Sequence, residues 1–170
     1  MLCIASVVTI APPARAATPA VRWVRPVQGP IVRRFIAPVT IYGPGHRGVD
    51  IQSSDGVPVG AAASGRVLFA GLVAGHLHVT VRHPTSGWVT GYSNLASVAV
   101  RPGMQVRAGE MIGRIGGTLA NHRRSTLHFS LRIAGQYRDP ETLFGSGPRA
   151  RVHLVPFGRA QPTARPFGLW

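Results

Sequence analysis

The sequence predicts an all-β fold, a compact antiparallel β-sheet domain, and three observations support this prediction. Apolar residues recur at every second position in several short runs, which is the period of a half-buried strand. The 21 glycines and 15 prolines interrupt these runs, as is typical of frequent turns. No stretch keeps a helical period for longer than a turn or two. With 170 residues and 45% hydrophobic composition, the chain can form one domain with its own core.

Residues 1–16 have the features of an export signal. A short apolar run, Leu2 to Ile10, precedes Ala14-Arg15-Ala16, which has small residues at the two positions that a signal peptidase reads. We expect cleavage after Ala16 and no membrane span in the mature chain, because two prolines and an arginine end the run well short of about 20 residues. Cys3, the single cysteine, would leave with the signal, which excludes disulfides and thiolate ligands from the mature protein. The alternative is a frayed N-terminal strand in a cytoplasmic protein.

Turn signals divide the first half of the predicted domain, which runs from residue 17 to residue 144, into short strands. Gln28-Gly29-Pro30 separates the first two strands, and Ser53-Ser54-Asp55-Gly56 ends the third. The alternation of Leu77, Val79 and Val81 with polar residues predicts a strand with one buried face. The strands expected in this half are residues 23–27, 31–35, 49–52, 57–59, 65–71 and 77–82.

The second half continues this pattern. Pro84-Thr85-Ser86-Gly87 is a turn signal that predicts a hairpin between residues 77–82 and residues 88–92. Residues 126–133 alternate again, with an apolar side and a polar side that carries Thr126 and His128. The other elements expected are short strands at 98–100, 106 and 111–115, one helical turn at 141–144, and a loosely ordered tail rich in Gly, Pro and Arg at 145–170.

The net charge of +14 comes from 19 arginines against 5 acidic residues, without a single lysine. Codon bias is one explanation, and an anionic partner such as a cell-wall polymer, a nucleic acid or a membrane surface is the other. We do not expect nucleic acid, because the arginines are spread along the chain and no motif combines basic residues with stacking aromatics. The missing lysines exclude lipoyl or biotinyl attachment and Schiff-base chemistry.

Three residues form a candidate metal site. His46 and Asp50 lie four positions apart among glycines, and imidazole and carboxylate are both zinc ligands. On an extended segment they would share a face, with Gly48 between them leaving room for an ion. His128 lies on the polar side of its strand, where a histidine is more often simply solvated. Taken together, the three residues would leave a fourth position open for water, as in a catalytic zinc site.

Several motifs resemble the lysostaphin/LytM group of zinc peptidoglycan endopeptidases. The resemblance covers roughly Trp23 to Phe144. The motifs are Gly45-His46-Arg47-Gly48-Val49-Asp50-Ile51, Val57 to Val67, Val106 to Gly116, Leu127-His128-Phe129 and Tyr137-Arg138-Asp139-Pro140. The resemblance implies a compact antiparallel β domain of the lysostaphin/LytM type, with His46, Asp50 and His128 as zinc ligands. It also implies endopeptidase activity on cell-wall peptide cross-links.

The sequence departs from this group at two places. The group usually shows Tyr-x-His-Leu on its middle strand and His-x-His on its last strand, whereas this chain has Asn94 and Thr126 in place of the two non-ligand histidines. Neither residue can accept and release a proton near neutral pH. Since losing one general acid–base typically costs ~10²- to 10⁴-fold in rate, we expect impaired hydrolysis. Asn94 can still donate a hydrogen bond to an oxyanion.

The remaining histidines are not expected to be ligands. His76 and His78 fall on a strand where the group has no ligand, and His83 is expected to be a turn residue. His122 lies in a loop with Arg123 and Arg124, from which it can reach the ion or a substrate only if the loop folds over the site.

Three functions therefore stay open at this stage. The chain is an active zinc endopeptidase, or an impaired or inactive relative that binds cell wall or regulates another hydrolase, or an exported basic module for an anionic polymer. The expected partner is peptidoglycan or another anionic cell-wall polymer, and the expected location is secreted or cell-wall associated.

Overall fold

The computed structural model describes residues 21–40, 43–84, 87–117 and 125–145. The predicted signal segment, the loop with His122, Arg123 and Arg124, and all of the predicted tail except Gly145 lie outside these ranges. The described elements are β1 (Ile31–Arg33), β2 (Val49–Gln52), β3 (Pro58–Gly60), β4 (Gly65–Val73), β5 (His76–His83), β6 (Trp88–Val98), β7 (Gln105–Val106), β8 (Met111–Ile115), β9 (Thr126–Ile133), β10 (Gln136–Arg138) and the 3₁₀ helix η1 (Pro140–Phe144).

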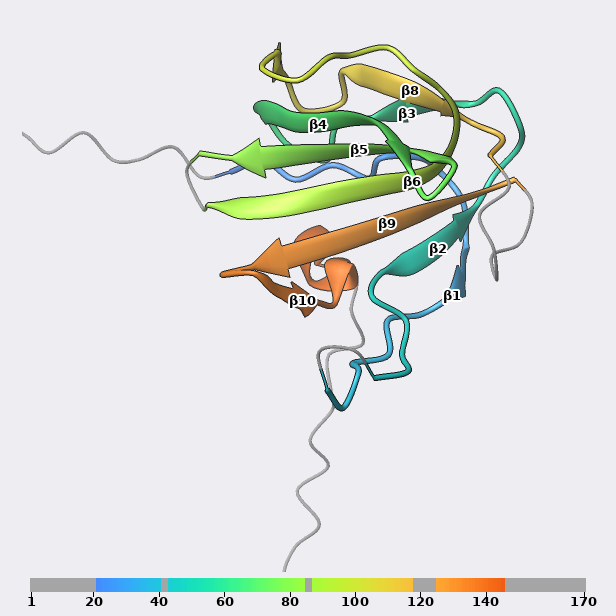
Figure 1. Ribbon diagram of the computed structural model, residues 1–170, viewed down its shortest axis with the longest axis vertical. Coiled ribbons are helices and arrows are strands. Elements are labelled where there is room, and N and C mark those ends of the chain that lie inside the picture. The colour runs from blue at the N-terminus through green and yellow to red at the C-terminus, as the bar shows by residue number, and fades with distance from the viewer. Residues whose placement is uncertain (1–20, 41–42, 85–86, 118–124, 146–170) are drawn as a thin grey trace, which may run out of the picture.

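The strands form one antiparallel sheet, which confirms the predicted all-β class. Its main path runs β1-β2-β9-β6-β5-β4-β7, with β10 paired to β9 and β8 paired to both β3 and β6 (Figure 1). β9 therefore lies between β2 and β6, next to strands that precede it by many residues in the chain. In the four described ranges no helix is long and apolar enough to cross a membrane.

The core lies on the apolar face of β9 and of its neighbours. Leu127, Phe129 and Leu131 are completely buried, as their alternation with polar residues predicts. Leu127 and Phe129 belong to a cluster with residues of β2, β3, β6 and β8. Its other largest fully buried apolar side chains include Val49, Ile51, Val59, Tyr92, Ile112 and Ile115.

Several predicted boundaries differ from the structure by one or two residues, β10 was not predicted, and two segments differ more substantially. Residues 23–27 are not a strand: the Val24 N–H donates to the Ala62 carbonyl and the Pro26 carbonyl accepts from Gly60, but no ladder forms. Pro26 lacks the N–H that a ladder needs at that position. The separate pieces expected at 88–92 and 98–100 are largely one long strand, β6, which continues to Val98 through a bulge at Asn94 with φ of 68°.

A buried hydrogen-bond chain connects strands β5 and β6 to the segment before β4. The Ala62 N–H donates to the Tyr92 hydroxyl at 2.7 Å, and the hydroxyls of Tyr92 and Thr90 are hydrogen-bonded at 2.9 Å. His83 contacts the Thr90 hydroxyl and the Ser64 carbonyl through its two ring nitrogens. Burial raises the pKa of Tyr92 to about 12 and lowers the pKa of His83. His83 is thus a fully buried strand residue, and its assignment to a turn is wrong.

We expect Tyr92→Phe to lower the free energy of unfolding by about 1–3 kcal/mol, because it leaves the Ala62 N–H buried without its acceptor. Urea denaturation followed by circular dichroism measures this difference. Tyr137→Phe removes a hydroxyl from a side chain that is 37% exposed, and should change stability little. Equal effects of the two substitutions would contradict a structural role for the Tyr92 hydroxyl.

Candidate metal centre

The three predicted ligands meet in one buried cluster. His46 Nε2 lies 3.1 Å from Asp50 Oδ1 and 3.1 Å from His128 Nδ1, and His128 Nδ1 lies 2.9 Å from Asp50 Oδ1. His46 and Asp50 are 3% and 2% exposed, and the His128 side chain is 14% exposed. These atoms form a group of nitrogen and oxygen donors that can hold a metal ion.

Strand pairing and a single bridge position the three side chains. Asp50 on β2 is paired directly with His128 on β9, so both side chains leave the sheet on the same face. His46 lies outside β2 and is held by an isolated bridge to Ile36, with a backbone hydrogen bond in each direction. His46 and Asp50 therefore do meet, although the chain between them is bent rather than one continuous strand.

Gly48 makes room for the His128 ring and for the backbone of β9. A Cβ atom at this position would lie 2.4 Å from the Phe129 carbonyl oxygen and 2.8 Å from His128 Cε1. Real Cβ atoms do not come this close, so any larger residue would displace β9 or turn the His128 ring.

The hydrogen bonding of His46 makes its Nε2 an acceptor inside the cluster. Its Nδ1 lies 2.8 Å from the Arg34 carbonyl oxygen, which can only accept, so Nδ1 carries the proton. In the neutral ring Nε2 is then an acceptor, and it faces a second acceptor, Asp50 Oδ1. A proton or a metal ion must lie there. The donor set fits zinc, since ligands at 2.0–2.1 Å in a tetrahedron lie roughly 3.3 Å apart.

Asn94 and Thr126 lie in contact with each other. Asn94 Nδ2 donates to the Thr126 carbonyl oxygen at 2.6 Å and lies 3.4 Å from the Thr126 hydroxyl. Both residues are buried. Thr126 precedes His128 by two positions on β9, so the two side chains share a face. Asn94 is thus hydrogen-bonded to β9, the strand that carries both Thr126 and the predicted ligand His128.

One row of paired residues extends the site to a histidine that the prediction set aside. Asp50, His128, Ser93 and His78 are successive partners across β2, β9, β6 and β5, so they share one face. The His78 ring is hydrogen-bonded to the Ser93 hydroxyl at 2.6 Å and lies over Gly91, where a Cβ would come within 3.2 Å of it. The alternation along residues 77–82 predicts on which face of its strand His78 lies. The position of His78 relative to His128 follows only from the register of the four strands.

Burial lowers the pKa of His78 to about 4, and the positive charges that His128 and Arg132 carry when protonated add to this effect. His78 is consequently a neutral ring near pH 7, able to donate and accept a hydrogen bond but not to carry a charge.

The model of peptidase family M23 matches residues 44–140 of this chain. Two curated relatives illustrate the similarity. The outer membrane antigenic lipoprotein B of Histophilus somni is 32% identical over 124 residues, which are 72% of this chain and 35% of that protein. The murein hydrolase activator NlpD of Escherichia coli (strain K12) is 30% identical over 124 residues, which are 72% of this chain and 31% of that protein. This chain spans about a third of the length of each of them.

A solved structure shows the same fold. The catalytic domain of lysostaphin from Staphylococcus simulans aligns with a TM-score of 0.57 at 26% identity, over 67% of this chain and 90% of that one.

We expect the His78 imidazole to titrate with a midpoint near 4 and to stay neutral above pH 6. Because the pKa in the folded protein lies below that of the unfolded chain, His78 opposes folding increasingly as the pH falls from about 6.5 towards 4. Imidazole NMR resonances followed against pH measure the midpoint, with His78→Gln to assign the signal. A midpoint at 6 or above would contradict the burial of this ring.

Proposed function

The chain belongs to peptidase family M23, and we propose that it is an exported zinc-binding domain that acts on or binds the peptide cross-links of bacterial peptidoglycan, with impaired hydrolysis. One observation carries the proposal. A buried His46-Asp50-His128 cluster is retained, while the two neighbouring polar positions hold Asn94 and Thr126, which cannot transfer protons.

His46 Nε2, Asp50 Oδ1 and His128 Nδ1 would hold the zinc. A bound zinc ion would supply a Lewis acid that activates water and polarises a carbonyl oxygen. The Arg34 carbonyl keeps His46 Nε2 available for this role, because it accepts the proton on Nδ1.

Asn94 and Thr126 decide how far the chemistry proceeds. Asn94 Nδ2 is committed to the Thr126 carbonyl, which fixes the amide beside the ligand strand. A fixed amide and a hydroxyl can orient a bound peptide by hydrogen bonds, but neither one accepts a proton near pH 7. Hydrolysis is therefore slowed by ~10²- to 10⁴-fold for each missing acid–base, while the hydrogen bonds that bind the peptide are kept.

A regulatory role is the second candidate, and the similarity to NlpD favours it. That relative is named a murein hydrolase activator. A domain that holds cell-wall peptides without cutting them efficiently could act in the same way, by delivering or switching on another hydrolase. Addition of the purified protein to an active murein hydrolase tests this alternative, because an activator raises the hydrolase rate even when it has no activity by itself.

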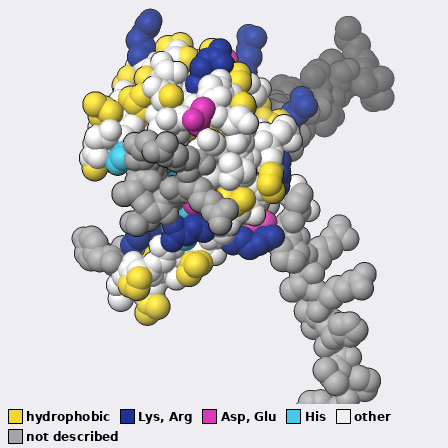
Figure 2. All heavy atoms as spheres, turned by 90° about the vertical axis from the view of Figure 1, so that its right-hand side faces the viewer, with side chains coloured by type: hydrophobic (Ala, Val, Ile, Leu, Met, Phe, Trp, Pro, Cys, Tyr) yellow, Lys and Arg dark blue, Asp and Glu magenta, His cyan; other side chains and the backbone are white. Residues whose placement is uncertain are grey.

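The bacterial cell envelope is the proposed location. The signal features of residues 1–16 and the similarity to an outer membrane lipoprotein support it. The charge of +14 suits an anionic cell-wall polymer as partner. On the face drawn in Figure 2 the basic side chains occur at several separate places, so attraction to such a polymer would act over a broad surface.

We expect Asp50→Ala to lower the zinc content of the purified protein well below one ion per chain, because it removes one of three protein ligands. Elemental analysis after dialysis against zinc measures the stoichiometry. Asp55→Ala is the matched control, since Asp55 lies in the exposed turn after β2. Circular dichroism verifies that both variants fold. Unchanged zinc content in a folded Asp50→Ala protein would rule out this site.

The double substitution Asn94→His with Thr126→His should raise peptidoglycan hydrolysis above that of the parent by about tenfold or more, because it supplies two imidazoles for proton transfer. The left-handed backbone at position 94, with φ of 68°, is one that histidine tolerates better than most residues. Chromatography of released muropeptides measures the rate. Parent activity that the two histidines do not improve would contradict impairment at these positions.

A further inference from the structure

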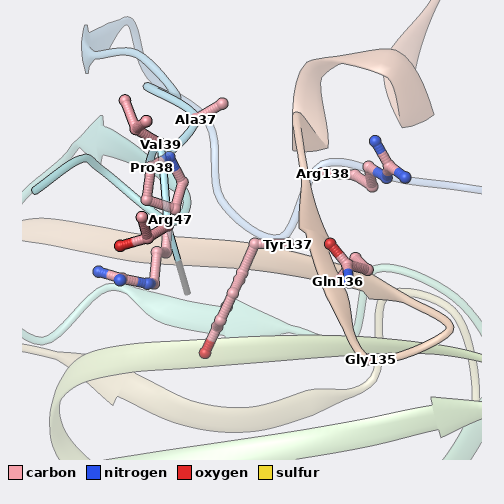
Figure 3. Close-up of a pocket in the computed structure, with 9 residues that line it drawn as sticks. Ala37, Pro38, Val39, Arg47, Gly135, Gln136, Tyr137 and Arg138 are labelled. Carbon is pink, nitrogen blue, oxygen red and sulfur yellow. The ribbon is translucent and has the colours of Figure 1, made fainter. Parts of the chain in front are cut away.

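A cavity of about 480 Å³ lies between the segment that precedes β2 and the hairpin of β9 and β10. Its volume is in the range of small-ligand sites. Figure 3 shows Arg47 and Tyr137 on two sides of this space, while Arg138 projects away from both. The lining residues are Ala37, Pro38, Val39, Thr40, Arg47, Gly135, Gln136, Tyr137 and Arg138.

Two of the lining residues connect the cavity to the candidate metal centre. Arg47 directly follows His46, and its Nη2 donates to the Gly43 carbonyl at 3.1 Å, which fixes the side chain against the segment before His46. Tyr137 is paired with Arg132, which is four residues beyond His128 on β9 and on the same face. That interval corresponds to roughly 13 Å along a strand. A short peptide bound at the metal centre can therefore place one end in this cavity.

The chemistry of the lining favours an anion. None of the nine described residues that form it is acidic. The Arg132 guanidinium lies 5.8 Å from the Tyr137 ring centroid and adds positive charge behind that ring.

We propose that this cavity binds a carboxylate of the peptide that occupies the metal centre, with Arg47 as the cationic partner and Tyr137 as a second hydrogen-bond donor. A guanidinium matches a planar carboxylate with two parallel N–H donors. Pro38 and Val39, which is 94% exposed, offer apolar surface to the adjoining aliphatic part of such a peptide. The inference rests on the proposed function and adds to it the class of group that the domain recognises next to the metal.

The test compares two probes that differ in a single charge. N-acetyl-alanyl-alanine with a free carboxylate and its C-terminal amide are titrated into the full chain, and affinities are measured from backbone NMR shifts at residues 47 and 135–138. We expect the amide to bind about tenfold more weakly than the acid. Arg47→Gln should weaken binding of the acid by a similar factor and leave the affinity for the amide unchanged. This pattern is expected when the Arg47 guanidinium pairs directly with the carboxylate. Tyr137→Phe should produce a smaller loss, and Arg101→Gln, in an exposed turn away from the cavity, none.

Each other outcome is decisive. Equal affinity for acid and amide, or no measurable binding of either probe, overturns the proposal. Tighter binding of inorganic phosphate than of the acid at residues 47 and 135–138 also overturns it, in favour of a phosphate site. Zinc content is measured in the same samples. Recognition of the carboxylate without bound zinc would contradict the proposed function but not this inference. Bound zinc without recognition of the carboxylate would contradict this inference alone.

Discussion

The pairing of β2 with β9 is the constraint on which the site depends. Asp50 lies opposite His128 because Val49 pairs with Phe129 and Ile51 with Leu127. These four apolar residues are at most 1% exposed. A slip of one residue would send them to the polar face and carry one ligand into the core. Hydrophobic packing on one face of the sheet thus sets the geometry of the metal centre on the other face.

Arg34 ties the metal centre to the end of the described domain. Its backbone carbonyl accepts the Nδ1 proton of His46 at 2.8 Å, while its guanidinium pairs with Glu141 at 2.6 Å. Glu141 belongs to η1, which begins at Pro140 with Asp139 as its N-cap. The orientation of one ligand is therefore linked to residues almost a hundred positions away, and Figure 1 shows η1 beside β9 and β10. This link gives the closing 3₁₀ turn a role in the site as well as in the fold.

The described part of the polar face of the sheet offers many hydrogen-bonding groups, but Asn94 and Thr126 supply no group for proton transfer. Metal ligands, a fixed amide at Asn94 and a neutral ring at His78 provide donors and acceptors for a bound peptide. The described part of this face adds Arg47 and Arg132 beside the cavity. Hydrogen bonds and charge of this kind stabilise a ligand, whereas hydrolysis also needs a group that takes up and releases a proton. The arrangement accordingly supports the proposal of a domain that binds cell-wall peptide better than it cuts it.

The sequence by itself determined the fold class, most strands and the three residues of the candidate metal cluster. Period two along residues 126–133 assigned both faces of β9, and the ligand types of His46, Asp50 and His128 are readable without coordinates. Only the tertiary structure decided the part of His78, the tautomer of His46 and the room made by Gly48. These features depend on strand register and on a carbonyl twelve residues upstream. Local patterns reveal which side of a strand a residue faces, but the neighbours that it meets there are set by long-range pairing.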